Sequence, residues 1–130
     1  MNYYNEIKNK LIDNEVYKRV KDYSKNRNDL NTYYEVGKLL IEAQGGEERA
    51  KYGDRLIKEY SERLYNELGK KYDITTLKRY RQFYLKIEKG AALRHQLSWT
   101  HYRELLTLDN INELNYYVEI TIEQNLSYDS

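Results

Sequence analysis

The side chains best suited to chemistry in this sequence lie on one side of a predicted helix between Thr75 and Glu88. At about 100° per residue, five polar or basic side chains fall on one third of this helix: Thr75, Lys78, Arg79, Gln82 and Lys86. Hydroxyl, amide and guanidinium groups bond the edges of DNA bases, and cationic groups attract phosphates. This set predicts recognition of nucleic acid, without any bond-breaking chemistry.

We expect the contacts to divide by position along that helix. The first turns of a recognition helix enter the major groove deepest, so base-edge contacts are predicted for Thr75, Lys78, Arg79 and Gln82. Phosphate contacts are predicted for the flanking cations, which are Arg55, Lys70, Lys71, Lys86 and Arg94.

Residues that would support catalysis or metal binding are scarce. The chain has no cysteine and two histidines, and no zinc, calcium or phosphate-loop motif is present. We therefore predict no catalytic residues, no metal and no cofactor. For His101 a structural hydrogen bond is favoured over a phosphate contact. For Trp99 a place in the core is favoured over stacking on bases.

The element that must position these side chains is a helix-turn-helix at about residues 54–89. Apolar side chains recur at helical spacing on both of its helices: Leu56, Ile57, Tyr60, Leu64 and Leu68 on the first, and Leu77, Tyr80, Phe83, Tyr84 and Ile87 on the second. The two stripes can face each other and exclude water. Gly69 suits a left-handed helix end, and Asp73 or Thr75 can cap the second helix.

The rest of the chain continues this helical periodicity, which predicts one all-α domain, 1–130, with five to seven helices. A helix is expected over Tyr3–Ser24, with an interruption near Asp13-Asn14. A second is expected over Asp29–Ala43, where Gly37 suits a close contact between helices.

Cap residues mark the later helices. Ser98 is expected to begin one helix and Asp109 the last full one. Residues 126–130 look like the opening of a further helix. We therefore expect a longer protein, in which another helix follows this chain.

The charges are unevenly distributed. Residues 49–103 contain fourteen Lys and Arg against six Asp and Glu, whereas residues 104–130 contain six acids and no base. A basic middle that coincides with the predicted helix-turn-helix is what docking on phosphates requires. No apolar run reaches the length needed to span a bilayer, and the absence of cysteine fits a reducing compartment. We therefore expect a cytoplasmic protein without membrane contact.

Three strings resemble the N-terminal domain of the YhcG family of bacterial proteins: YYEVGKLLIEAQGGEERAKYG at Tyr33–Gly53, LKRYRQFYLKIE at Leu77–Glu88 and LSWTHYRELLTLDN at Leu97–Asn110. The resemblance covers nearly the whole chain. It implies a helical domain with a helix-turn-helix that precedes a PD-(D/E)XK nuclease domain. The catalytic half is absent here, so the resemblance carries no nuclease activity to this chain. The layout after residue 97 is also similar to the DNA-binding domain of ParB-type partition proteins.

Two functions remain in competition. The first is a DNA-binding module for double-stranded DNA that targets a separate nuclease domain and is not itself an enzyme. The alternative is a helical protein–protein interaction module of the same nuclease system, which would form a homodimer or dock a partner. For that alternative, the acidic C-terminal helix with Tyr116 and Tyr117 would meet a basic surface. A free-standing enzyme is the least favoured function.

Overall fold

The computed structural model describes residues 2–20, 25–50, 53–70 and 72–129, with the side chains of 20, 25–28 and 125–129 excepted. Within these ranges the chain forms seven α-helices and no β-strand, which confirms the all-α prediction. The helices are α1 (Tyr3–Val20), α2 (Lys25–Ala43), α3 (Glu47–Ala50), α4 (Arg55–Leu68), α5 (Ile74–Glu88), α6 (Trp99–Leu105) and α7 (Ile111–Asp129).

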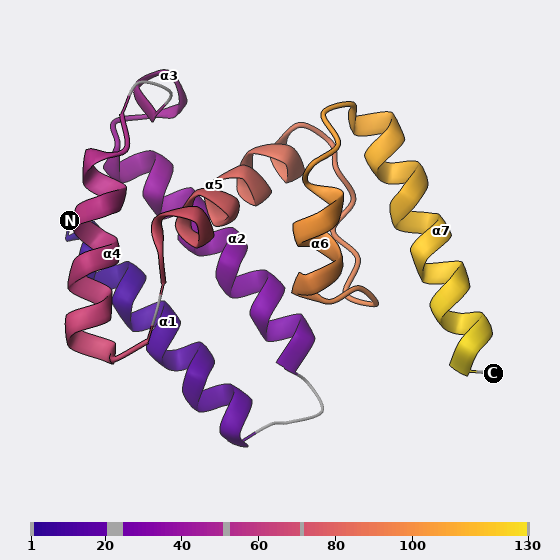
Figure 1. Ribbon diagram of the computed structural model, residues 1–130, viewed down its shortest axis with the longest axis horizontal. Helices are drawn as coiled ribbons and strands as arrows, with labels where there is room; N and C mark the ends of the chain where they lie inside the picture. Colours follow the sequence, from indigo (N-terminus) through magenta and orange to yellow (C-terminus); the bar gives the residue numbers. More distant parts are fainter. Residues whose placement is uncertain (1, 21–24, 51–52, 71, 130) are drawn as a thin grey trace.

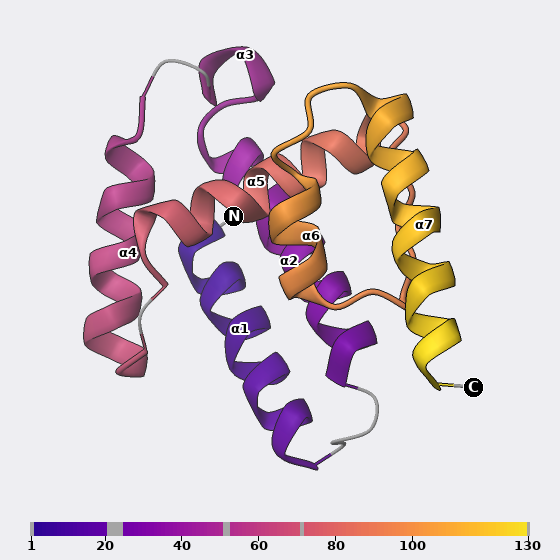
Figure 2. The same cartoon turned by 45° about the vertical axis from the view of Figure 1, so that its right-hand side comes forward.

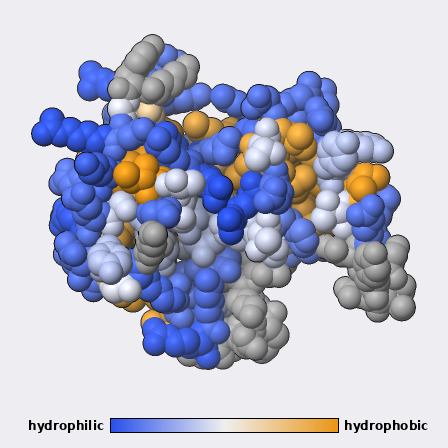
Figure 3. Space-filling model, in the orientation of Figure 1, coloured by the Kyte–Doolittle hydropathy of each residue, from blue (hydrophilic) through white to orange (hydrophobic). Residues whose placement is uncertain are grey.

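Helix α5 lies at the centre of the arrangement. Helix α2 packs along α5, and α1 lies antiparallel to α2 (Figure 1). On α6, Trp99 and Tyr102 contact Phe83 of α5. Helices α4 and α7 lie at opposite edges in both views (Figures 1 and 2). The face in Figure 3 is largely hydrophilic over α1 and α4, whereas apolar residues show around α6, between α5 and α7.

The core is built on the buried face of α5. Leu77 and Phe83 are fully buried and Tyr80 is nearly so. The Tyr80 ring stacks on Tyr33 of α2, with 4.2 Å between ring centroids. Trp99 completes this aromatic cluster, with its centroid 5.2 Å from Tyr80 and 5.3 Å from Phe83. Trp99 therefore belongs to the core, as its sequence context indicates.

The packing of α5 differs from the expectation that its apolar stripe would face α4. Its most extensive contacts are with α2 and its contacts with α4 are fewer. Gly37 explains this preference, because it lets the two backbones approach closely: a Cβ atom there would meet the Tyr80 carbonyl oxygen at 2.1 Å. The prediction of a close helix contact at Gly37 is confirmed.

The helix ends form where the sequence predicts their cap residues, with one departure. Gly69 adopts a left-handed conformation at the end of α4, and the Asp73 carboxylate accepts a bond of 2.8 Å from the Thr76 N–H at the start of α5. Asp109 does not cap α7, because the Asn110 side chain accepts from the Glu113 N–H at 3.0 Å instead. Ser98 caps α6 as predicted.

Two predicted boundaries were wrong. Helix α1 runs unbroken through Asp13-Asn14, because the Asn14 side chain is buried and donates to the Asp29 carboxylate at 2.8 Å. The end expected for that helix, 21–24, lies outside the described residues. Residues 126–129 continue α7 and do not open another helix, because no glycine or proline interrupts the chain after Ile111.

Candidate nucleic-acid interface

The outer face of α5 carries an open groove of about 430 Å³, here called the α5 groove. It is lined by Thr75, Lys78, Arg79, Arg81, Gln82 and Leu85. The structure thus brings together all four residues predicted to contact base edges. They lie on the helix face opposite the buried Leu77 and Phe83, as the sequence periodicity indicates.

Thr75 and Arg79 are the members of the groove most available to a ligand. Thr75 is exposed in the first turn of α5, and Arg79 is half-buried one turn further on. Among the residues that the structure describes, none forms a hydrogen bond or an ion pair with the Arg79 guanidinium. A planar fork of donors without a protein partner is suited to a phosphate or a guanine edge.

Lys78 and Arg81 face a carboxylate across the groove. The Lys78 ammonium lies 2.6 Å from one Asp54 oxygen, and the Arg81 Nη2 lies 3.8 Å from the other. The Arg81 Nη1 donates to the Gln44 side chain at 2.7 Å and to the Ala50 carbonyl at 3.3 Å. Burial lowers the pKa of Arg81, although Asp54 opposes this effect. Sequence reasoning missed Arg81 and Asp54. Arg81 lies beside the apolar face of α5 in the sequence. Since a buried guanidinium needs partners, this position could have indicated that Arg81 bonds groups within the fold.

Gln82 and Lys86 bond within the fold. The Gln82 amide donates to the Leu106 carbonyl at 3.1 Å, and the Lys86 ammonium donates to the Leu106 and Leu108 carbonyls, each at 2.6 Å. These carbonyls lie at the end of α6, where helix geometry leaves them without intrahelical partners. Burial lowers the pKa of Lys86. A phosphate contact from Lys86 would have to compete with both of its present bonds.

The flanking cations are spread over the molecule. Arg55 is exposed at the first residue of α4. Lys70 pairs with Glu15 of α1, and Arg94 pairs with Glu119 of α7. Lys71, also predicted to contact phosphate, lies outside the described residues. Of the three described cations, Arg55, Lys70 and Arg94, only Arg55 is not already paired with a described carboxylate.

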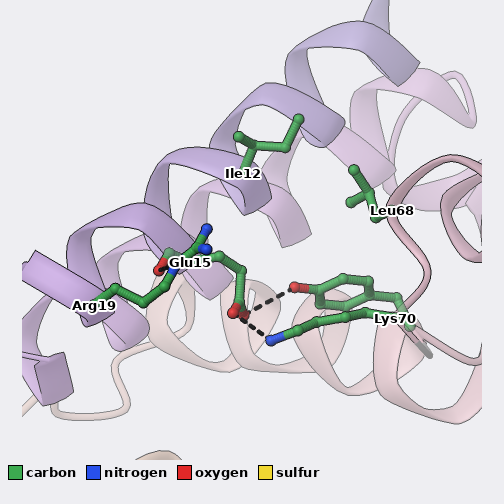
Figure 4. Close-up of a pocket in the computed structure, with 6 residues that line it drawn as sticks. Ile12, Glu15, Arg19, Leu68 and Lys70 are labelled. Atoms are coloured by element: carbon green, nitrogen blue, oxygen red, sulfur yellow. Dashed lines mark hydrogen bonds and ion pairs between the residues drawn. The ribbon is translucent and has the colours of Figure 1, made fainter.

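Glu15 fixes the turn that leads into α5. Its side chain points from α1 across a cavity of about 390 Å³ toward that turn (Figure 4). It accepts bonds from the Lys70 ammonium and, at 3.3 Å, from the Tyr72 hydroxyl. Burial raises the pKa of the Glu15 carboxyl, but the bonds and charges of Lys70 and Lys18 outweigh this and leave the pKa below its usual value. The start of α5 is therefore tied to α1.

The two histidines do not take part in the α5 groove. The Ser98 N–H donates to His101 Nδ1 at 3.0 Å and the His101 N–H donates to Ser98 Oγ at 3.4 Å, so His101 belongs to the cap of α6. His95 bonds Asn31 at 3.1 Å. In the described parts of the chain no three His, Cys, Asp or Glu side chains come together as a metal site. No helix in those parts is long and apolar enough to cross a bilayer.

Comparison with known proteins supports the resemblance seen in the sequence. A family model described as the DUF1016 N-terminal domain matches residues 7–130, which confirms the resemblance to the YhcG N-terminal domain. No curated protein and no solved structure matches the chain.

Proposed function

This chain belongs to the DUF1016 N-terminal domain family, and from this membership and the α5 groove we propose that it is a DNA-binding module. In this proposal α4 and α5 form a helix-turn-helix, and α5 enters the major groove of double-stranded DNA. The module directs a separate PD-(D/E)XK nuclease domain, which follows it in the longer protein, to its target.

The observation that carries the proposal is Arg79 in the first half of α5, whose guanidinium has no bonding partner among the described residues. It stands beside Thr75 and Lys78 in the α5 groove, on a helix whose opposite face is held in the core by Leu77 and Phe83. A rigid helix that presents such donors outward matches the geometry of a recognition helix. Arg55 adds a cation at the start of α4.

Titration of the chain with duplex DNA at two salt concentrations tests the proposal. With Arg55, Lys78 and Arg79 as phosphate contacts, counterion release gives a slope of log K against log salt of about −3. If Lys70, Lys86 and Arg94 also contacted phosphate, the slope would be about −5. The smaller value is expected because these three cations do not line the α5 groove and already bond protein oxygens. Affinity below detection at about 50 mM salt would overturn the proposal.

We assign no cleavage activity to the module itself. The α5 groove is lined by cationic, amide, hydroxyl and apolar side chains, whereas metal-dependent cleavage uses carboxylates that hold the metal. Incubation of plasmid with the purified chain and Mg²⁺ or Mn²⁺ should leave the plasmid intact. Cleavage that a chelator abolishes would contradict this assignment.

One observation favours the alternative of an interaction module. Tyr116 and Tyr117 of α7 are 61% and 44% exposed, and their rings contact each other edge to face at 5.2 Å. Exposed tyrosines on an acidic helix suit contact with a basic protein surface. If the chain binds no DNA and forms a homodimer that Tyr116→Ser disrupts, the interaction module is the better description.

A further inference from the structure

Asp54 stands at the N-terminus of α4 without capping that helix. An aspartate in this position usually accepts a bond from a free helix N–H, but the Asp54 side chain makes no such bond. Its carboxylate turns toward α5 instead, 2.6 Å from the Lys78 ammonium and 3.8 Å from Arg81 Nη2. The position of this carboxylate is therefore set by the two cations of α5.

Arg81 is held so that one edge of its guanidinium faces that carboxylate. Its Nη1 is fixed by Gln44 at 2.7 Å and by the Ala50 carbonyl at 3.3 Å. Gln44 is itself anchored, since its amide donates to the Gly53 carbonyl at 2.9 Å. The Arg81 side chain is 16% exposed, whereas Lys78 and Asp54 are 40% and 48% exposed. An arginine anchored at one nitrogen and open at the other is oriented in advance for an anion.

We infer that Lys78 and Arg81 form a phosphate site that the Asp54 carboxylate occupies in the free protein. The inference rests on the proposed DNA binding. A phosphodiester of the DNA backbone presents anionic oxygens like those of a carboxylate, and it would displace Asp54 toward solvent. Since Asp54 is already half-exposed and exposed ion pairs contribute little, this exchange is feasible without unfolding. Asp54 thus lowers the affinity of the α5 groove for phosphate.

The variant Asp54→Asn tests this inference in the full 130-residue chain. Asp54 forms no cap bond and its pair with Lys78 is exposed, so the fold should persist, and a circular dichroism melt checks it. Duplex DNA is titrated at about 50 mM salt. Removal of one exposed ion pair predicts about two- to fivefold tighter binding. The slope against salt should stay close to that of the parent chain, because the same phosphate contact forms in both chains and only the competing carboxylate is removed.

Glu59→Gln is the matched control, because it removes one negative charge from an exposed position of α4. It should give a smaller gain than Asp54→Asn. Asp54→Asn is also made in a chain that carries Lys78→Ala. In that background, Asp54→Asn should increase the affinity for DNA by a smaller factor.

The outcomes separate the two proposals. If the parent chain binds DNA and Asp54→Asn gains no more than Glu59→Gln, the phosphate site is refuted and the DNA-binding proposal stands. If neither the parent chain nor Asp54→Asn binds DNA, both are refuted. A gain from Asp54→Asn that is equally large without Lys78 also refutes the phosphate site.

Discussion

Gly37 of α2 lies so close to Tyr80 of α5 that a Cβ atom on Gly37 would stand 2.1 Å from the Tyr80 carbonyl oxygen. Gly37→Ala should therefore destabilise the fold by about 1–3 kcal/mol, the usual cost of overpacking. This loss should appear although alanine favours a helix over glycine by about 1 kcal/mol. Urea unfolding followed by circular dichroism measures the difference.

The neighbouring exposed position supplies the control. Lys38→Ala, on the same helix, should change stability by less than about 0.5 kcal/mol. A stabilising Gly37→Ala would mean that α2 and α5 can move apart at no cost, and would contradict the close contact.

The two faces of α5 should separate binding from stability. Arg79→Ala should leave stability within about 0.5 kcal/mol, because Arg79 has no described partner. It should weaken DNA binding by about 1–3 kcal/mol if the guanidinium reads a guanine edge. Phe83→Ala should instead cost about 3–5 kcal/mol of stability, because the ring is fully buried against Trp99 and Tyr102. Thermal melts and DNA titrations of both variants check this. If Arg79→Ala binds DNA as tightly as the parent chain, α5 is not the recognition helix.

Periodicity and cap chemistry were sufficient to place α5 and its two faces. Leu77, Tyr80 and Phe83 are buried and Thr75 is exposed, as the helical spacing predicts. Tyr84, assigned to the same apolar stripe, is only half-buried, because it flanks the contact with Gly37 and packs beside Tyr34 with 5.1 Å between ring centroids. Helical spacing does not show where the apolar face of a helix ends. It therefore cannot predict how deeply the residues at the margin of that face are buried.

The partners of the charged side chains could not be predicted in the same way. Lys70 meets Glu15 from another helix, and Lys86 meets backbone carbonyls at the end of α6. Helical spacing shows which side of a helix a cation occupies, but it does not show what packs there. Tertiary packing alone therefore separates Arg79, which is unpaired among the described residues, from cations that already serve the fold.

Lys86→Ala tests whether this lysine stabilises the fold or contacts DNA phosphate. Its ammonium bonds two carbonyls at the end of α6, and hydrogen bonds to a charged group contribute about 1.5–3 kcal/mol. We expect a loss of about 2 kcal/mol in urea unfolding. Lys89→Ala is the control, because its ion pair with Glu47 is exposed and such pairs contribute at most about 1 kcal/mol. Unchanged stability with weakened DNA binding would restore Lys86 as a phosphate contact.

Glu15→Gln should reveal a pH-dependent tie between α1 and the turn before α5. Because Lys70 and Lys18 outweigh burial and lower the pKa of Glu15, the folded state favours the charged carboxylate. The resulting stability is present above the unfolded pKa, about 4.3, and is lost as the pH falls through the lower folded pKa. Glu15→Gln should therefore lower the free energy of unfolding by about 1 kcal/mol at pH 7. At pH 3 the difference in unfolding free energy between the variant and the parent should be smaller. Glu59→Gln, at an exposed position, should show little gap at either pH. Urea unfolding at both pH values measures this, and a Glu15→Gln gap that widens in acid would show that Glu15 is held in its neutral form.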